Sequence, residues 1–188
     1  MVLGVACLLG AGALVLYNSW EAESAETDTR ALLADVQSLL DETEPTEEPT
    51  VHPTEMATVK VDGYDCIGIL SIPVLDLELP VLTEWSYTKL KKAPCHYYGS
   101  CYEEDFVIAA HNYKAHFGRL SELQAGDVVS FTDVSGTTHY YEVVLLETLP
   151  KEATQEMITS GFDLSLYTCT SGGVNRVTVR CRAVKGSN

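Results

Sequence analysis

The chain has 188 residues and a formal net charge of −15, from 12 basic and 27 acidic side chains. This length is enough for one globular domain with appendages. Nucleic acid is excluded as a partner, because contacts to phosphates require clusters of Lys and Arg that this acidic chain lacks.

The N-terminal segment is uniformly apolar. Residues 2–17 are all apolar or small, and Glu21 is the first charged residue. Extended through Trp20, the stretch approaches the ~20 residues that span a bilayer, and Tyr17 and Trp20 are suited to the membrane interface. It also lacks the basic start of a signal peptide. Residues 1–20 are therefore predicted to be a membrane anchor, with a cleaved signal sequence as the alternative.

Residues 21–57 are predicted to be an acidic connection. From Glu21 to Glu55 there are eleven acidic residues and one basic residue, Arg30. Five apolar residues recur at helical spacing, namely Leu32, Leu33, Val36, Leu39 and Leu40. They predict an amphipathic helix at about 28–40, which either packs on the domain or stands off the membrane. The Pro-, Thr- and Glu-rich residues 41–57 predict an extended polar linker.

Residues 58–188 have the pattern of an all-β domain. Short β-rich runs predict strands near 66–72, 78–82, 106–111, 128–132, 139–148, 165–169 and 176–184. Brief helices are predicted at 86–92 and 153–160, and a hairpin turn at 133–136. About 130 residues with this pattern predict a closed or nearly closed β-barrel.

Three reactive side chains stand at the ends of predicted strands: His111, Cys169 and Arg176. Because side chains alternate along a strand, the apolar residues of each strand lie on the face opposite its reactive residue. A barrel that buries the apolar faces would present all three in an outer groove. A thiol, an imidazole and a guanidinium together can attack a carbonyl and stabilise the resulting charge. His116 is the alternative to His111, and Arg180 is the alternative to Arg176.

Three segments resemble the sortases, the membrane-anchored cysteine transpeptidases of Gram-positive bacteria. Residues 67–73 with 79–81 look like the first strands of that family. Residues 108–111, with Phe117-Gly118-Arg119-Leu120 and Ala125-Gly126-Asp127 after them, are similar to its histidine strand. Ser165-Leu166-Tyr167-Thr168-Cys169 resembles its Thr-Leu-x-Thr-Cys signature, with Ser in the first place, and Arg176 falls where the family arginine opens the last strand.

The resemblance implies an eight-stranded sortase-like β-barrel with short helices, preceded by a transmembrane helix and held outside the cell. It implies that Cys169 is the nucleophile, that His111 is the general acid, and that Arg176 stabilises the oxyanion. The substrate would be a sorting signal of Leu-Pro-x-Thr-Gly type, cut after Thr through a thioester on the cysteine. The acceptor amine would come from a peptidoglycan precursor or a pilin lysine, so that surface proteins, pilins and the membrane would be the partners.

The sortase class is left open by the sequence. There is no Asp-Pro-Trp-type lid in the linker, which argues against the pilus-building class that carries one, and the chain is closest to classes B and D. Four residues near the catalytic trio are assigned to substrate binding: Thr168, Asn112, Asn175 and Arg180. A turn or cap role is the alternative for the two asparagines, and inward packing is the alternative for Thr168.

The other cysteines leave several alternatives open. Cys66 and Cys181 are expected to be small buried hydrophobes. Cys95 and Cys101 are candidates for a disulfide, or, with His96 and either His111 or His116, for a zinc site. The acidic residues 103–105 are a candidate for Ca²⁺, although three successive side chains cannot all face one ion. The prediction is that the enzyme needs no metal or cofactor.

Two other functions compete with transpeptidation. A cysteine peptidase would use the same nucleophile and release the acyl group to water. A surface binding module would keep the barrel without the chemistry.

Overall fold

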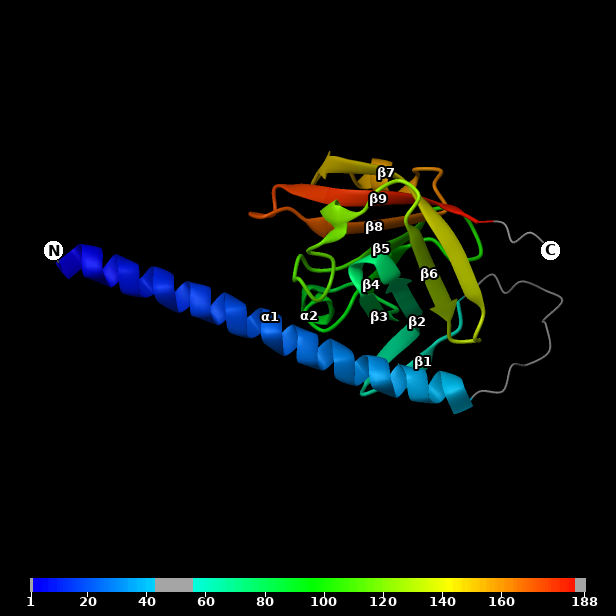
Figure 1. Ribbon diagram of the computed structural model, residues 1–188, viewed down its shortest axis with the longest axis horizontal. Coiled ribbons are helices and arrows are strands. Elements are labelled where there is room, and N and C mark those ends of the chain that lie inside the picture. Colours follow the sequence, from blue (N-terminus) through cyan, green and yellow to red (C-terminus); the bar gives the residue numbers. More distant parts are fainter. Residues whose placement is uncertain (1, 43–55, 185–188) are drawn as a thin grey trace.

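The computed structural model describes residues 2–42 and 56–184, and it consists of one long helix beside a β-barrel. Helix α1 (Val2–Glu42) lies along one side of the barrel and continues far beyond it at its N-terminal end (Figure 1). Most of the predicted linker, residues 43–55, lies outside the described residues. The helix therefore runs without a break across the predicted boundary between the membrane anchor and the acidic segment.

The barrel is a closed ring of eight strands. The described residues form nine strands, of which the last eight make the ring: β1 (Val59–Val61), β2 (Tyr64–Ile72), β3 (Leu77–Leu82), β4 (Cys95–Tyr98), β5 (Phe106–Ala109), β6 (Val128–Asp133), β7 (Thr138–Pro150), β8 (Leu164–Cys169) and β9 (Asn175–Ala183). Their order is β1-β2-β3-β4-β5-β8-β9-β7-β6, and a further pairing of β6 with β2 closes the ring of β2 to β9. Strand β1 is added outside this ring by its pairing with β2. The predicted eight-stranded barrel is confirmed.

The connecting helices are short. They are η1 (Pro73–Leu75), α2 (Tyr87–Leu90), η2 (Leu120–Glu122) and α3 (Thr154–Ile158). The predicted helices at 86–92 and 153–160 are thus present, and the predicted turn at 133–136 joins β6 to β7. Strand β4 was not predicted, because its four residues between Pro94 and Gly99 are too few to show an alternating pattern.

The barrel interior is filled by the apolar faces of the strands. Phe106, Phe131, Leu164 and Leu166 are fully buried there and belong to one continuous hydrophobic cluster. In β8 the two leucines alternate with residues of the outer face, as the sequence pattern predicts. The interior is therefore a packed core, and any substrate must bind on the outside.

A second hydrophobic cluster lies between α1 and the outer face of the barrel. Ala25, Leu32 and Val36 of α1 are buried, at the spacing that places them on one side of a helix. Leu32 and Val36 pack with residues of β1 to β5, including Val61, Ile69, Leu82, Cys95 and Ala109. The predicted amphipathic face of α1 thus packs on the domain, and it is part of a much longer helix than the sequence pattern indicated.

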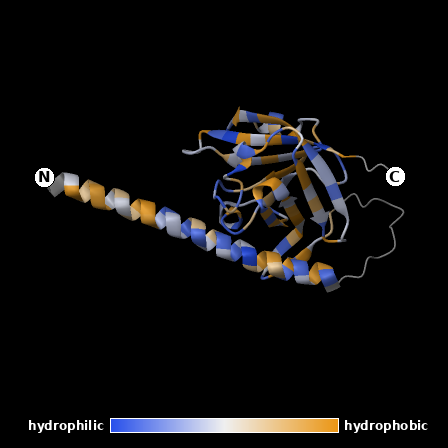
Figure 2. Ribbon diagram, viewed as in Figure 1, coloured by the Kyte–Doolittle hydropathy of each residue, from blue (hydrophilic) through white to orange (hydrophobic). Residues whose placement is uncertain are grey.

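The N-terminal half of α1 makes no such contacts. Its large apolar side chains are exposed, among them Leu8 and Leu16 at 75% and 72%. Figure 2 shows that apolar residues dominate this half, whereas hydrophilic residues dominate where α1 first meets the barrel. By length and composition this helix could cross a membrane.

Candidate active site

The ends of three neighbouring strands bring Cys169, Arg176 and His111 together. Cys169 ends β8 and lies directly opposite Arg176 in the antiparallel register of β8 and β9. Strand β5 pairs with β8 in parallel, with Ala109 opposite Tyr167, so that His111 follows β5 at the level of Cys169. Opposed residues on paired strands have Cβ atoms ~5 Å apart. The three predicted catalytic residues therefore converge at one end of the barrel.

Hydrogen bonds between β5 and β8 fix the approach of His111 to Cys169. The Ala110 amide donates to the Tyr167 carbonyl at 3.2 Å. The Thr168 hydroxyl donates to the Ala110 carbonyl at 2.8 Å, and Thr168 is only 3% exposed. The Thr168 hydroxyl thus links the ends of β8 and β5. This agrees with the inward packing considered for Thr168 from the sequence.

A cavity of about 240 Å³ lies beside the half-buried Cys169. Its lining comes from three segments: Asn112, Phe117, Gly118 and Ser121 after β5, Thr168 to Ser171 after β8, and Val177. Two of the predicted substrate-binding residues, Thr168 and Asn112, therefore share a cavity with the proposed nucleophile.

The loop that follows His111 is held in a compact shape. The Phe117 amide donates to the His111 carbonyl at 3.1 Å, and the Gly118 amide donates to the Tyr113 carbonyl at 2.9 Å. A Cβ atom at Gly118 would lie 2.6 Å from the Asn112 carbonyl oxygen, too close for any other residue type without movement. Gly118 therefore permits the tight turn that presents His111 and Asn112.

The His111 ring is partly buried. It stacks on Tyr113 with ring centroids 4.8 Å apart. Its Nε2 atom is buried and has no hydrogen-bond partner among the described residues. Burial lowers the pKa of His111, Lys91 lowers it further, and Glu21 opposes both. The lowered pKa favours the neutral form of the ring, which is the form that can accept a proton.

His116 does not line the cavity beside Cys169. It is fully buried, and its Nε2 lies 2.7 Å from the Thr29 hydroxyl of α1. The same hydroxyl also contacts the Lys92 and Ala25 carbonyls, which can only accept, so His116 Nε2 carries the hydrogen and Thr29 accepts it. His116, which the sequence left as the alternative to His111, therefore joins the His111 loop to α1.

We expect the Thr29→Val variant to lose ~1–3 kcal/mol of unfolding free energy, because a buried donor on His116 and a buried acceptor on Lys92 would lose their partner. Urea unfolding measures this loss. Thr27→Val is the matched control, since Thr27 makes the same type of bond to the carbonyl four residues earlier but is exposed. Equal losses in the two variants would show that Thr29 does not secure the loop.

Stability is also expected to fall in mild acid through His116. Burial lowers the pKa of His116 to about 4, with His111 acting in the same direction, whereas an unfolded histidine titrates near ~6.5. The unfolded state binds the proton first, so the stabilisation is complete above pH ~6.5 and is lost as pH falls towards 4. Between pH 7.5 and 5 the loss should be about 2 kcal/mol.

The measurement is urea unfolding of the parent and of His116→Gln at both pH values. Gln keeps an N–H donor for Thr29 but does not titrate, so this variant should show a flatter pH dependence. A parent and a variant with equal slopes would contradict the assignment.

Arg176 and Asn175 sit at the turn between β8 and β9. Arg176 Nη1 donates to the carbonyls of Gly173 and Asn175, both at 3.1 Å. The Asn175 backbone closes the turn with Thr170, whose amide donates to the Asn175 carbonyl at 2.9 Å. In the described residues the Nε and Nη2 atoms of Arg176 make no hydrogen bond, so they are available to a substrate. Asn175 acts through its backbone, in agreement with the turn role considered from the sequence.

Arg180 lies outside the groove, in contrast to its predicted contact with substrate. It shares a face with Arg176 but is only 2% exposed, because α3 and the chain after it cover this part of β9. Its Nε donates to Glu147 at 2.7 Å, and Nη1 donates to Ser165 at 2.8 Å. Strand alternation identified the face correctly but could not show what covers it. Arg180 therefore has a structural position, and Ser165 is its partner.

Several residues near the site were missed from the sequence. Tyr97 and Tyr167 pack edge to face with ring centroids 5.4 Å apart, and Trp85 lies 6.2 Å from Tyr97. Tyr167 is on the same face of β8 as Cys169, so strand alternation could have revealed it. Tyr97 and Trp85 come from β4 and the loop after β3, and no sequence signal connects them to β8. Together the three rings form an aromatic surface next to the nucleophile.

Cys95 and Cys101, which the sequence left as candidates for a disulfide or a zinc site, lie in different hydrophobic clusters. All six cysteines, each within the described residues, are free. Cys95 belongs to the cluster under α1, whereas Cys101 belongs to the barrel interior. The proposed disulfide and the zinc set of Cys95, Cys101 and His111 or His116 are therefore wrong, because the barrel wall separates the two thiols.

The acidic residues 103–105 do not converge on one point. Asp105 Oδ1 accepts hydrogen bonds from the amides of Ser160 and Gly161, at 2.7 and 2.9 Å. Glu103 and Glu104 are exposed instead. Asp105 thus holds the loop before β8, and the segment is an acidic turn.

Comparison with known proteins identifies the architecture. A family model described as "Sortase domain" matches residues 70–184. Sortase C1 from Streptococcus suis is 25% identical with a TM-score of 0.59, and the match covers 65% of this chain and 74% of that protein. Sortase A from Corynebacterium diphtheriae is 20% identical with a TM-score of 0.60, covering 95% and 97%.

A third structure contains a peptide motif. Sortase C from Clostridium perfringens with the C-terminal cell wall sorting motif is 18% identical with a TM-score of 0.58, and the match covers 94% of this chain and 100% of that one. No curated protein matches the chain. The likenesses below 25% identity support the shared fold, and they do not select a sortase class.

Proposed function

The chain belongs to the sortase family, and on that premise we propose that it is a membrane-anchored transpeptidase acting on a sorting signal of Leu-Pro-x-Thr-Gly type. The observation that supports this most directly is the convergence of Cys169, His111 and Arg176 at the ends of β8, β5 and β9. It would cut between Thr and Gly and join the new carboxyl terminus to an amine.

In the first half of the reaction the Cys169 sulfur attacks the Thr carbonyl carbon. The thiol proton passes to His111, whose free Nε2 is a suitable acceptor. Arg176 donates to the oxyanion of the tetrahedral intermediate. His111 then returns the proton to the leaving Gly nitrogen, the C–N bond breaks, and a thioester forms on Cys169.

In the second half an amine replaces the leaving peptide. The amine nitrogen attacks the thioester carbonyl, Arg176 again stabilises the oxyanion, and His111 takes the excess proton. The C–S bond breaks, and His111 passes this proton to the departing sulfur, which regenerates the Cys169 thiol and the neutral imidazole. A thioester is a good acyl donor to amines, which favours transfer over hydrolysis. No metal or cofactor is needed for any step.

The aromatic surface of Trp85, Tyr97 and Tyr167 is our candidate for the apolar part of the sorting signal. It lies on the outer face of the same strand as Cys169, and leucine and proline side chains bind well to aromatic rings. Asn112 lines the cavity at the nucleophile and is a candidate for a hydrogen bond to the peptide backbone. Thr168 acts by fixing the strand ends.

The position of α1 favours an acceptor that is itself close to the membrane. Glu21, the first charged residue, forms an ion pair with Lys91, and both influence the titration of His111. Ala25 is the first fully buried residue of α1, five positions after Trp20. Thr29, which contacts His116 of the His111 loop, follows Trp20 by nine residues, so at 1.5 Å per residue the loop would lie within ~14 Å of the membrane interface. A peptidoglycan precursor anchored in the outer leaflet would be within reach, whereas a pilin lysine is the second candidate.

The test uses the full chain in detergent with a Leu-Pro-x-Thr-Gly peptide and a panel of amines, including peptidoglycan stem peptides and a lysine-bearing pilin. Mass spectrometry should detect a product in which Thr is joined to the amine. Hydrolysis alone with every amine would support a cysteine peptidase. Unchanged surface display in cells carrying the Cys169→Ala variant would support a binding module.

A further inference from the structure

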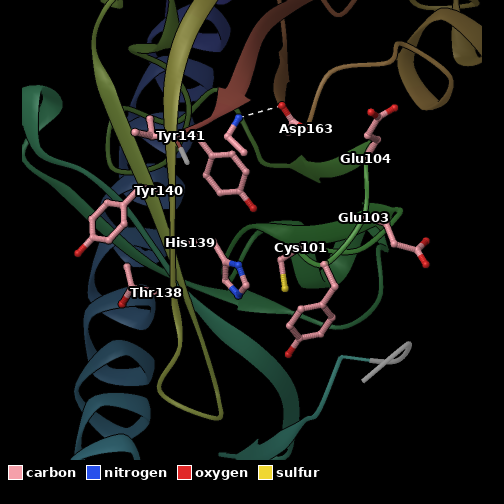
Figure 3. Close-up of a pocket in the computed structure, with 11 residues that line it drawn as sticks. Cys101, Glu103, Glu104, Thr138, His139, Tyr140, Tyr141 and Asp163 are labelled. Carbon is pink, nitrogen blue, oxygen red and sulfur yellow. Dashed lines mark hydrogen bonds between the residues drawn. The ribbon is translucent and has the colours of Figure 1, made fainter. Parts of the chain in front are cut away.

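The larger cavity lies at the opposite end of the barrel from Cys169. Its volume is about 570 Å³, and it is lined by Cys101, Tyr102, Glu103, Glu104, Asp163 and residues at the start of β7 and the end of β9 (Figure 3). Asp163, at its edge, precedes β8, and Cys169 ends β8. Six residues of extended strand separate the two, which corresponds to ~20 Å. The cavity is thus independent of the proposed transfer reaction.

Three side chains with metal-binding atoms meet beside this cavity. The Cys101 sulfur, an Asp133 carboxylate oxygen and a His139 ring nitrogen all lie within 4.8 Å of one another. Cys101 and Asp133 are 8% and 3% exposed. Figure 3 shows the Cys101 thiol and the His139 imidazole side by side. They come from the loop after β4, the end of β6 and the start of β7, so no sequence spacing reveals the group.

The geometry is close to that of a tetrahedral metal site. The His139 Nε2 and Asp133 Oδ2 atoms are 3.2 Å apart. Ligands at ~2.0–2.1 Å from Zn²⁺ in a tetrahedron are ~3.3 Å from each other, so this pair already has the required separation. A sulfur at ~2.3 Å would lie ~3.6 Å from each of them, so each of these distances would have to shorten by no more than ~1.2 Å.

The surroundings of Asp133 hold it in place for such a role. Its Oδ1 accepts hydrogen bonds from the amides of Ser135 and Thr137, at 2.9 and 3.0 Å. The Tyr102 hydroxyl donates to Oδ2 at 2.9 Å. The β6–β7 hairpin therefore fixes Asp133 and presents His139 six residues further on, while Cys101 and His139 face the cavity. Polar partners that orient a ligating carboxylate are typical of metal sites.

We propose that Cys101, Asp133 and His139 bind one Zn²⁺ ion, with the fourth position open to the cavity. One thiolate, one imidazole and one carboxylate suit Zn²⁺, whereas Ca²⁺ and Mg²⁺ prefer oxygen ligands only. Binding replaces the S–H bond of Cys101 by a Zn–S bond, and the proton is released to solvent. The ion joins the loop after β4 to the β6–β7 hairpin and stabilises the end of the barrel away from the reaction.

The test uses Co²⁺ as a spectroscopic probe of the full chain in detergent, after treatment with a chelator. The Cys169→Ala background removes the half-buried thiol of the other site as a competing ligand. One equivalent of Co²⁺ should produce a thiolate-to-metal charge-transfer band in the near ultraviolet together with visible bands of tetrahedral cobalt. Zn²⁺ should displace it and raise the melting temperature.

Three variants decide the assignment. Cys101→Ser should abolish the charge-transfer band, whereas the matched control Cys95→Ser, another buried thiol, should keep it. His139→Gln leaves the thiol in place and should weaken Co²⁺ binding at least ~10-fold. Absence of a charge-transfer band in the parent, its persistence in Cys101→Ser, or unchanged affinity in His139→Gln would each overturn the proposal.

Discussion

Replacement of Cys169 by Ala is expected to abolish both acyl-enzyme formation and transfer, with a loss of roughly 10⁴-fold or more, because no other thiol is among the described residues that line the cavity beside the His111 loop. The parent enzyme should gain the mass of the acyl fragment when it is mixed with the peptide alone. It should lose that mass when hydroxylamine or an amine is added. The variant should show neither change.

Cys181→Ala is the control for this experiment. Cys181 is a buried thiol of β9 that faces the barrel interior, so its loss removes a sulfur without touching the groove. A variant at Cys169 that still forms an adduct, or a control that loses the adduct while remaining folded, would refute the assignment of the nucleophile.

Arg176→Ala is expected to lower the transfer rate by ~10²–10³, the usual cost of losing an oxyanion donor. The effect should appear mainly in kcat, because the oxyanion exists only in the transition state and the intermediate. Arg176→Lys should recover part of the rate, since an ammonium keeps the charge but not the planar geometry. Steady-state kinetics with peptide and amine measure both variants.

Arg182→Ala is the charge-matched control. Arg182 lies six residues further along β9, where it contacts Gly161 and stacks over Phe162. Its removal changes the net charge equally but should leave kcat within about twofold of the parent. Because Arg176 also binds two carbonyls of the β8–β9 turn, the melting temperature is measured alongside the rate. If Arg176→Ala lowered the rate no more than Arg182→Ala does, an oxyanion role would be contradicted. The same holds if the lower melting temperature of Arg176→Ala accounted for its whole loss of rate.

The continuous helix α1 connects its exposed apolar half, which is the proposed membrane anchor, to the candidate active site. Thr29 contacts His116, and Glu21 pairs with Lys91, so that the loop carrying His111 rests on α1. Removing residues 2–42 would expose Leu82, Cys95 and their neighbours on the outer barrel face and would free one side of this loop. A soluble barrel without α1 is therefore an incomplete version of this protein.

Local sequence information predicted the strands because alternation depends only on neighbouring residues. Leu164 and Leu166 point inward, and Cys169 lies on the other face of β8. His111 and Arg176 were predicted to lie near Cys169 because all three residues stand at strand ends, on the face opposite the apolar residues of their strands. The same logic misplaced Arg180, since alternation gives the face of a strand but not the helix that covers it.

The amino-acid sequence alone was enough to predict the all-β barrel, the apolar start of the chain and the position of three candidate catalytic residues at strand ends. Each of these follows from periodicity or from a short motif, which are properties of adjacent residues. Only the tertiary structure decided that Thr29 of α1 meets His116, that Cys95 and Cys101 lie in separate cores, and that Cys101 joins Asp133 and His139. These contacts join residues brought together by barrel closure and helix packing, and no local pattern encodes such distances.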